Sequence, residues 1–173
     1  MSTIKIEDSD HIIGSPSAPI VLVEYADYQC PYCGQAYSII KQLQKKFGDK
    51  MAFVFRNYPI QELHPYALHA AIAAETADLQ GKFWEMHDII FEHQRFLDDD
   101  SLISYAQRIG LDMEKFKEDF GGKPTINKVE KDMETGNKAG VQGTPAFYVN
   151  GKYFTGNWTT PEFMDYIESF LSE

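Results

Sequence analysis

Apolar positions along this chain follow two different periods. Residues 20–25, Ile-Val-Leu-Val-Glu-Tyr, are apolar at both parities, which is typical of a strand covered on both faces, as in a parallel sheet. An apolar stripe at helical spacing then runs from Ala36 to Phe47 and stops before Gly48. This stripe predicts a helix of roughly five turns that begins near Cys30.

The middle of the chain predicts a large helical segment. A second strand is expected at 51–55, so the first third reads β-α-β, with the right-handed crossover that parallel strands require. From 64 to 139 the apolar residues keep the helical period and predict five helices, the first opened by Pro65 and the last ending near Gly140.

The C-terminal section predicts a hairpin and a last helix. Two short apolar runs flank Asn150-Gly151, the strongest short hairpin signal, because both turn residues must accept positive φ. Thr160 and Pro161 suit the N-cap and the first position of the last helix. The predicted class is α/β, in the order β-α-β, helical insertion, β-β-α.

We divide the chain accordingly into four parts. They are a loosely attached N-terminal leader at 1–14, an N-terminal half at 15–60, the helical insertion at 61–140 and a C-terminal half at 141–173. A length of 173 residues allows one domain.

Composition narrows the classes of partner. The net charge is −10 and the basic residues are scattered, so no patch suited to nucleic acid is expected. No apolar segment approaches the ~18–20 residues of a membrane helix, so membrane insertion is not expected. The first eight residues lack the features of a secretory signal. We therefore expect a cytoplasmic protein, or a periplasmic or extracytoplasmic one if a signal peptide has been removed.

The chemistry of the chain is expected at its two cysteines. Cys30 and Cys33 form a CxxC motif at a predicted strand-to-helix junction, which is too few cysteines for a structural disulfide framework. The free N–H groups and the dipole at a helix start favour the thiolate of Cys30. We expect Cys30 to be the nucleophile and Cys33 the resolving thiol, with no cofactor beyond this pair.

Three other uses of the motif compete with this interpretation. A structural zinc site needs four ligands, and the chain has neither a second cysteine pair nor two histidines at i,i+4, so no metal is expected. Haem attachment needs a histidine where Gly34 stands. Idle buried thiols stay possible as a third use. The four histidines of the insertion are expected at the surface or in helix packing: His64, His69, His87 and His93.

Several motifs together resemble the DsbA-like family of the thioredoxin-fold superfamily. They are the stretch from Glu24 to Gly34, then His64-Pro65, Gly81-Lys82-Phe83-Trp84 and Gly143-Thr144-Pro145-Ala146-Phe147. The similarity runs in order over residues 11–173. It implies a thioredoxin fold with an all-helical insertion between its halves and the activity of a thiol–disulfide oxidoreductase.

The resemblance also implies roles for residues outside the cysteines. Pro145 would be a cis-proline facing the dithiol, and the backbone of Thr144 would pair with an extended substrate. Pro31 and Tyr32 are the other residues expected to contact the substrate. Without the family context, a trans proline opening a strand is the ordinary expectation. The DsbA type has histidine where Tyr32 stands, so a weaker thiolate and a less oxidising couple are expected here.

Glu24 lies six residues before Cys30, within an otherwise apolar strand. A buried carboxylate is costly unless it has a role, and thioredoxin-like proteins place an acid behind the second cysteine. We hypothesise that Glu24 is the general acid/base for Cys33, directly or through a water. The alternative is a solvated carboxylate at the rim of the sheet.

The leading interpretation is an enzyme that exchanges disulfides with protein or small-molecule partners through its CPYC dithiol and is returned to its starting state by a redox recycling partner. The partners would be protein disulfides or dithiols, or glutathione. Alternatives are a glutaredoxin-like, glutathione-dependent reductase, a non-catalytic thioredoxin-fold binding module, and a glutathione-dependent isomerase.

Overall fold

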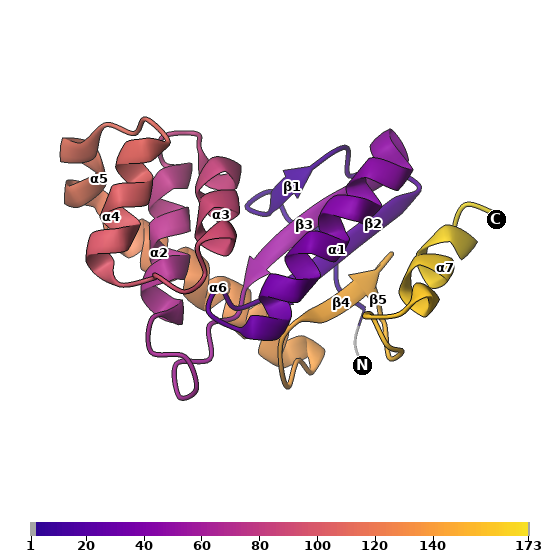
Figure 1. The fold of residues 1–173 in the computed structure, drawn as a ribbon. Coiled ribbons are helices and arrows are strands. Elements are labelled where there is room, and N and C mark those ends of the chain that lie inside the picture. Colours follow the sequence, from indigo (N-terminus) through magenta and orange to yellow (C-terminus); the bar gives the residue numbers. More distant parts are fainter. Residues whose placement is uncertain (1–2, 173) are drawn as a thin grey trace.

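The computed structural model describes residues 3–172 and contains a five-stranded sheet in the order β1-β3-β2-β4-β5. The central strand β2 (Ile20–Ala26) pairs in parallel with β3 (Met51–Asn57) and antiparallel with β4 (Ala146–Val149). The edge strands β1 (His11–Ile13) and β5 (Lys152–Tyr153) are both antiparallel to their neighbours (Figure 1).

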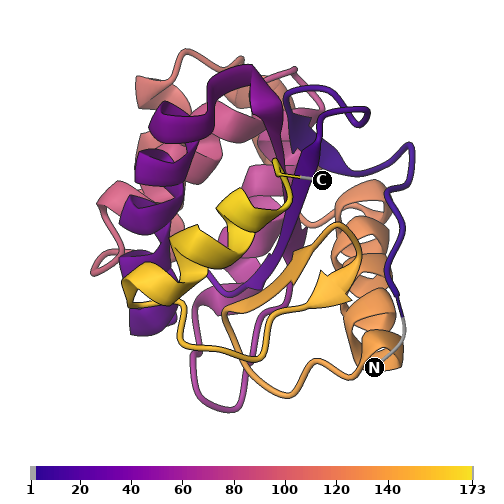
Figure 2. The ribbon, with the colours of Figure 1, turned by 90° about the vertical axis from the view of Figure 1, so that its right-hand side faces the viewer.

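Helices cover both faces of this sheet. In Figure 2, α1 (Pro31–Phe47) and α7 (Pro161–Ser169) lie on one side and α6 (Lys123–Ala139) on the other. The short 3-10 helix η1 (Gly48–Lys50) links α1 to β3. Because both faces are covered, β2 is apolar at both parities, as the sequence pattern predicted.

Successive residues of β2 point into two different clusters. Leu22 and Ala26 belong to the main core with the buried residues of α1, whereas Val23 and Tyr25 pack with Ala139 at the end of α6. Because side chains alternate along a strand, every even-numbered residue of β2 faces α1. This alternation decides where Glu24 points.

The insertion consists of five helices, as predicted. Four of them stack beside one end of the sheet (Figure 1): α2 (Ala67–Asp78), α3 (Phe83–Glu92), α4 (Asp99–Arg108) and α5 (Met113–Asp119). The fifth, α6, leads back along the sheet to β4. The α/β class is confirmed. None of the helices within residues 3–172 has the length and apolar character needed to cross a membrane.

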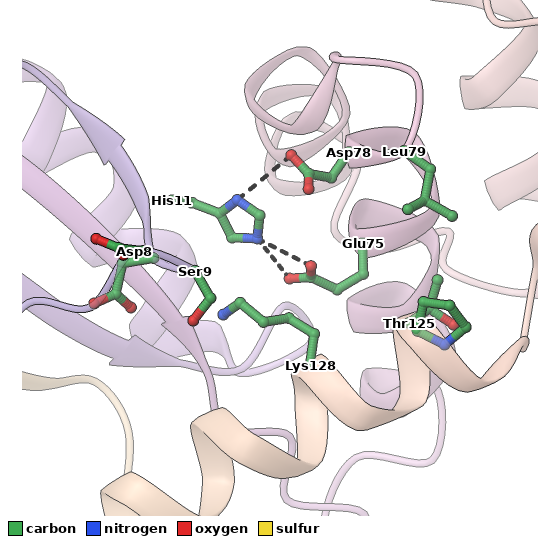
Figure 3. Close-up of a pocket in the computed structure, with 10 residues that line it drawn as sticks. Asp8, Ser9, His11, Glu75, Asp78, Leu79, Thr125 and Lys128 are labelled. Atoms are coloured by element: carbon green, nitrogen blue, oxygen red, sulfur yellow. Dashed lines mark hydrogen bonds and ion pairs between the residues drawn. The ribbon is translucent and has the colours of Figure 1, made fainter.

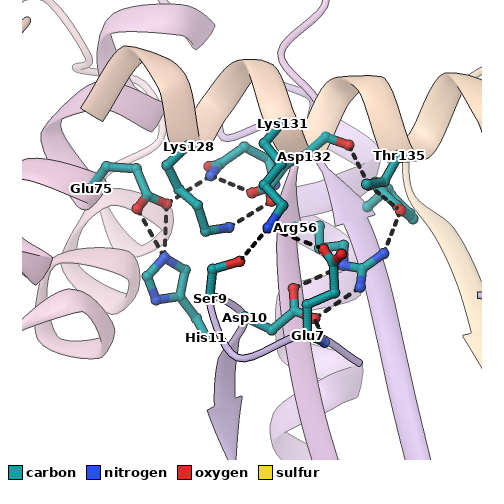
Figure 4. A network of polar contacts seen from close by, with 12 residues as sticks. Glu7, Ser9, Asp10, His11, Arg56, Glu75, Lys128, Lys131, Asp132 and Thr135 are labelled. Atoms are coloured by element: carbon teal, nitrogen blue, oxygen red, sulfur yellow. Dashed lines mark hydrogen bonds and ion pairs between the residues drawn. The ribbon is translucent and has the colours of Figure 1, made fainter. Parts of the chain in front are cut away.

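Residues 3–14 differ from the loosely attached leader that the sequence predicts over 1–14; residues 1 and 2 lie outside the described residues. β1 adds a strand to the sheet, with His11 opposite Phe55. The Asp10 carboxylate lies 2.8 Å from the Arg56 guanidinium, and both side chains are only 3% exposed. Figure 4 shows this ion pair between Asp10 and Arg56. Arg56 also donates to the carbonyl of Lys5. A three-residue strand carries no readable period, and its anchoring depends on long-range ion pairs, so the sequence pattern missed it.

Replacing Asp10 tests this anchoring. We predict that Asp10→Ala lowers the free energy of unfolding by about 3–5 kcal/mol, because it leaves the Arg56 guanidinium buried without its carboxylate. Chemical denaturation measures the change. Lys131→Ala is the matched control, since it removes exposed contacts of the same segment, an ion pair with Glu7 and a hydrogen bond to Ser9, and should cost at most about 1 kcal/mol. Equal losses in the two variants would contradict the assignment.

Candidate functional site

The two cysteines lie at the start of α1, where the sequence predicted them. Cys30 is the N-cap residue in an extended conformation, and Pro31 occupies the first helical turn, where its missing N–H costs nothing. Cys33 follows one turn later. Both are free thiols, and Cys33 is completely buried whereas Cys30 keeps 4% exposure. The helix therefore presents Cys30 and hides Cys33.

The surroundings of Cys30 favour its thiolate. The pKa of Cys30 is lowered to about 5. The largest cause is a hydrogen bond with the Cys33 thiol. Partial burial opposes this effect, and Thr144 and the N–H groups of Cys33 and Tyr32 add to it. This value lies within the range of activated thiols in CxxC motifs. At neutral pH Cys30 is therefore ionised.

The surroundings of Cys33 act in the opposite direction. Burial first, then its hydrogen bond with Cys30 and the negative charges of Glu24 and Cys30, raise the pKa of Cys33 well above its ordinary value. The backbone N–H of Asp27 lies 3.4 Å from the Cys33 sulfur and is a donor to it. The pair is therefore polarised, with a nucleophilic first thiol and a protonated second one.

Glu24 is buried at the middle of β2, opposite Phe55 on β3 and Phe147 on β4. Its parity directs it to the α1 side of the sheet, where Cys33 lies. Burial, followed by the charge of Cys30, raises the pKa of Glu24 to about 8. Its Oε2 has no hydrogen-bond partner among residues 3–172. The alternative of a solvated rim carboxylate is wrong.

The loop between α6 and β4 lies against the dithiol. The Thr144–Pro145 peptide bond is cis, in agreement with the family resemblance. The Cys30 sulfur lies 3.7 Å from the carbonyl oxygen of Thr144, 114 residues further along the chain. Tyr32, beside Cys30, is 64% exposed. The structure thus brings Cys30, Thr144 and the proline together at one surface.

Asp27 also belongs to this site, although the sequence pattern did not predict a role for it. Its Oδ1 accepts the N–H groups of Gln29 at 2.8 Å and Cys30 at 3.2 Å. Its Oδ2 accepts the N–H of Ile60 at 2.9 Å and lies 2.8 Å from His64 Nδ1. An aspartate side chain that accepts the N–H of the residue two positions later is a common turn motif, so the contact with Gln29 could have been predicted from the sequence. The contact with His64 carried no signal.

Gln94, just after α3, is a second missed residue. Its amide donates to the carbonyls of Tyr28 at 2.9 Å and Cys30 at 2.6 Å. A Cβ on Gly34 would collide with the side-chain oxygen of Gln94, so glycine after the second cysteine makes room for it. The insertion therefore supports the dithiol turn directly.

The remaining histidines of the insertion pack as expected. His87 is buried, its Nδ1 lies 2.9 Å from the Tyr28 hydroxyl, and burial lowers the pKa of His87 well below its ordinary value. His69 pairs with Asp99 near the start of α4, and His93 contacts the carbonyl of Ile89 within α3.

A group of possible metal ligands lies away from the dithiol, between β1 and α2 (Figure 3). It consists of His11, Glu75 and Asp78. His11 Nε2 lies 2.8 Å from Glu75, and Nδ1 lies 3.6 Å from Asp78, so each ring nitrogen already faces a carboxylate. The ring also stacks on Phe83. We assign these contacts to the attachment of β1 rather than to a metal centre.

A CxxC pair at the start of α1, a cis-proline loop against it and a helical insertion between the halves of the sheet define a DsbA-like thioredoxin fold. The family model described as Thioredoxin matches residues 7–169. The chain belongs to this family.

Solved structures agree with the assignment. BdbD from Bacillus subtilis is 28% identical with a TM-score of 0.88, and the match covers 99% of this chain and 98% of BdbD. A thioredoxin-like oxidoreductase from Silicibacter pomeroyi is 25% identical with a TM-score of 0.84, over 96% of this chain and 95% of that one. The thiol-disulfide exchange protein alpha-DsbA2 from Wolbachia pipientis, 22% identical over 94% of this chain and 88% of its own, shares the fold with a TM-score of 0.82.

Curated relatives include much longer proteins. Na(+)/H(+) antiporter NhaA 3 from Salinispora tropica is 41% identical over 149 residues, which are 86% of this chain and 23% of that protein. Na(+)/H(+) antiporter NhaA 1 from Mycobacterium sp. (strain KMS) is 39% identical over 94% of this chain and 27% of its own length. The chain thus spans about a quarter of the length of these relatives, and the similarity concerns that part of them.

Proposed function

We propose that this thiol–disulfide oxidoreductase works by two successive exchanges at Cys30 and Cys33. The carrying observation is the polarised pair, in which the pKa of Cys30 falls to about 5 while burial raises that of Cys33. An ionised first thiol that keeps some exposed surface, beside a protonated and fully buried second one, is the arrangement that attack followed by resolution requires.

The two steps balance as follows. The Cys30 thiolate attacks one sulfur of a partner disulfide, forms a mixed disulfide and releases the other sulfur as a thiolate. Cys33 then loses its proton and attacks Cys30, which closes the Cys30–Cys33 disulfide and releases the partner's second thiolate. The dithiol is oxidised by two electrons and the partner is reduced by two. In reverse, the closed pair oxidises a partner dithiol.

Glu24 is the proposed acceptor of the Cys33 proton. The Cys30 charge is one of the two causes that raise the pKa of Glu24. In the mixed disulfide Cys30 carries no charge, so this cause disappears when a base is needed. The pKa of Glu24 then falls toward neutrality, where a general base is most effective.

The surface around Cys30 favours a protein partner. Thr144 presents backbone beside the sulfur, where an extended segment could pair with it as an added strand. Large apolar side chains are exposed on the segments that surround the dithiol turn: Tyr32, Leu63, Tyr66 and Phe96. Pro31 and Tyr32 complete the proposed substrate contacts. Glutathione is the small-molecule alternative.

The direction of exchange depends on the compartment and the recycling partner. In the expected cytoplasmic location the dithiol would act mainly as a reductase, and in an oxidising compartment as an oxidant. Both the location and the recycling partner are predictions.

Trapping the intermediate tests the proposed function. We predict that Cys33→Ser, given a disulfide-containing peptide, accumulates a covalent adduct at Cys30, while Cys30→Ser forms none. Mass spectrometry of the acid-quenched protein measures the adduct. Retained turnover by Cys33→Ser with glutathione mixed disulfides would favour the glutaredoxin-like alternative. If wild-type Cys30 were not alkylated faster than a free thiol below neutral pH, a non-catalytic module would be favoured.

Replacing Glu24 tests the proton acceptor. We predict that Glu24→Gln slows resolution of the mixed disulfide on the order of 10²-fold at pH 7, because no base remains beside Cys33. In the wild type the rate should rise with pH until Glu24 is ionised, at or below a pH of about 8, and Glu24→Gln should lose that rise. Stopped-flow measurement of adduct decay follows both. An unchanged rate in the variant would contradict the role.

A further inference from the structure

The turn between β2 and α1 is held by a buried carboxylate with four partners. All are within 3.2 Å of Asp27, two from its own turn and two from the segment that leads into the insertion. The Asp27 side chain has no exposed surface, and that of His64 is 18% exposed. Both carboxylate oxygens accept backbone N–H groups, so His64 Nδ1 is the donor of the fourth bond.

The same residue touches the resolving thiol through its backbone. The Asp27 N–H lies 3.4 Å from the Cys33 sulfur. Its side chain at the same time binds the N–H of Cys30. A shift of Asp27 would therefore change the hydrogen bond to Cys33 and the start of α1 together.

We propose that Asp27 and His64 are positioning residues for resolution, which hold the turn so that the Asp27 N–H stays directed at the sulfur of Cys33 as it becomes a thiolate. The inference rests on the proposed function and assigns it a further element. A hydrogen bond to a charged acceptor is stronger than one to a neutral acceptor, so this contact strengthens as Cys33 ionises.

The effect is expected on the second thiol more than on the first. Burial raises the pKa of Cys33 most strongly, and the Asp27 N–H acts in the opposite direction. Cys30 instead depends on Cys33, Thr144 and the N–H groups of its own helix. Gln94 binds the carbonyls of Tyr28 and Cys30 in the same turn, so Cys30 keeps its place when the contacts of Asp27 are weakened.

A symmetrical aromatic disulfide reagent, 5,5'-dithiobis(2-nitrobenzoic acid), separates the two steps. Attack by Cys30 releases one coloured thiolate, and resolution by Cys33 releases the second. We expect Asp27→Asn to slow the second release about tenfold and the first less than about twofold. The carboxamide presents donors where the N–H of Ile60 and the imidazole now donate, so the turn loses its outer anchor.

His64 supplies variants that do not change the buried carboxylate. His64→Leu should slow the second release about threefold, whereas His64→Asn, whose amide can donate from near the place of Nδ1, should restore it. His69→Leu is the matched control. It removes another histidine–aspartate pair of the insertion, at 2.7 Å from Asp99 and outside the dithiol turn, and should change neither phase.

The outcomes separate the two proposals. Selective slowing of the second release, rescued in His64→Asn, supports the positioning role. Equal slowing of both releases in His64→Leu, or no change in either, would overturn it. Absence of the first release in the wild-type protein would overturn the proposed function itself, and this inference with it.

Discussion

The chemistry of the site depends on which of three acidic groups, Cys30, Cys33 and Glu24, carries negative charge. Glu24 and Cys33 lie in the core under α1, where burial disfavours the ionised form of both and the charge of Glu24 further disfavours that of Cys33. Negative charge in a low-dielectric interior is costly. It is therefore held at Cys30, at the helix start, where hydrogen bonds stabilise it. This distribution of charge favours the nucleophilic thiolate form of Cys30 and keeps Cys33 protonated until the second step.

Three separate parts of the chain maintain that distribution. The alternation of β2 directs Glu24 to the α1 side of the sheet, beside the first turn of that helix. The loop before β4 places Thr144 against Cys30, and the Thr144 side chain helps to lower the pKa of Cys30. The insertion contributes Gln94, which binds the carbonyl of Cys30. The helical insertion, which lies outside the β-α-β and β-β-α halves of the fold, thus helps to hold the turn that carries Cys30.

Much of this architecture was predictable because its signals are local. Periodicity predicted every helix of the insertion, and Asn150-Gly151 marked the hairpin correctly, with both residues at positive φ. CxxC at a strand-to-helix junction located the dithiol. The cis-proline followed only from the family resemblance, since proline before a strand is usually trans.

The missed features depend on contacts between distant residues. Asp10 meets Arg56 across 46 positions, and Asp27 meets His64 across 37. Nothing in the spacing of such residues indicates that they touch, because the pairing is set by the tertiary fold. A histidine that sequence statistics place at the surface therefore belongs to the turn that carries the chemistry.

The equilibrium potential of the Cys30/Cys33 couple against glutathione tests the polarised dithiol most directly. Stabilising the Cys30 thiolate stabilises the reduced form and raises the potential. The potential should therefore lie above that of thioredoxin, about −270 mV. It should lie below that of DsbA, about −120 mV, because Tyr32 stands where DsbA has a histidine. A potential at or below that of thioredoxin would contradict the account.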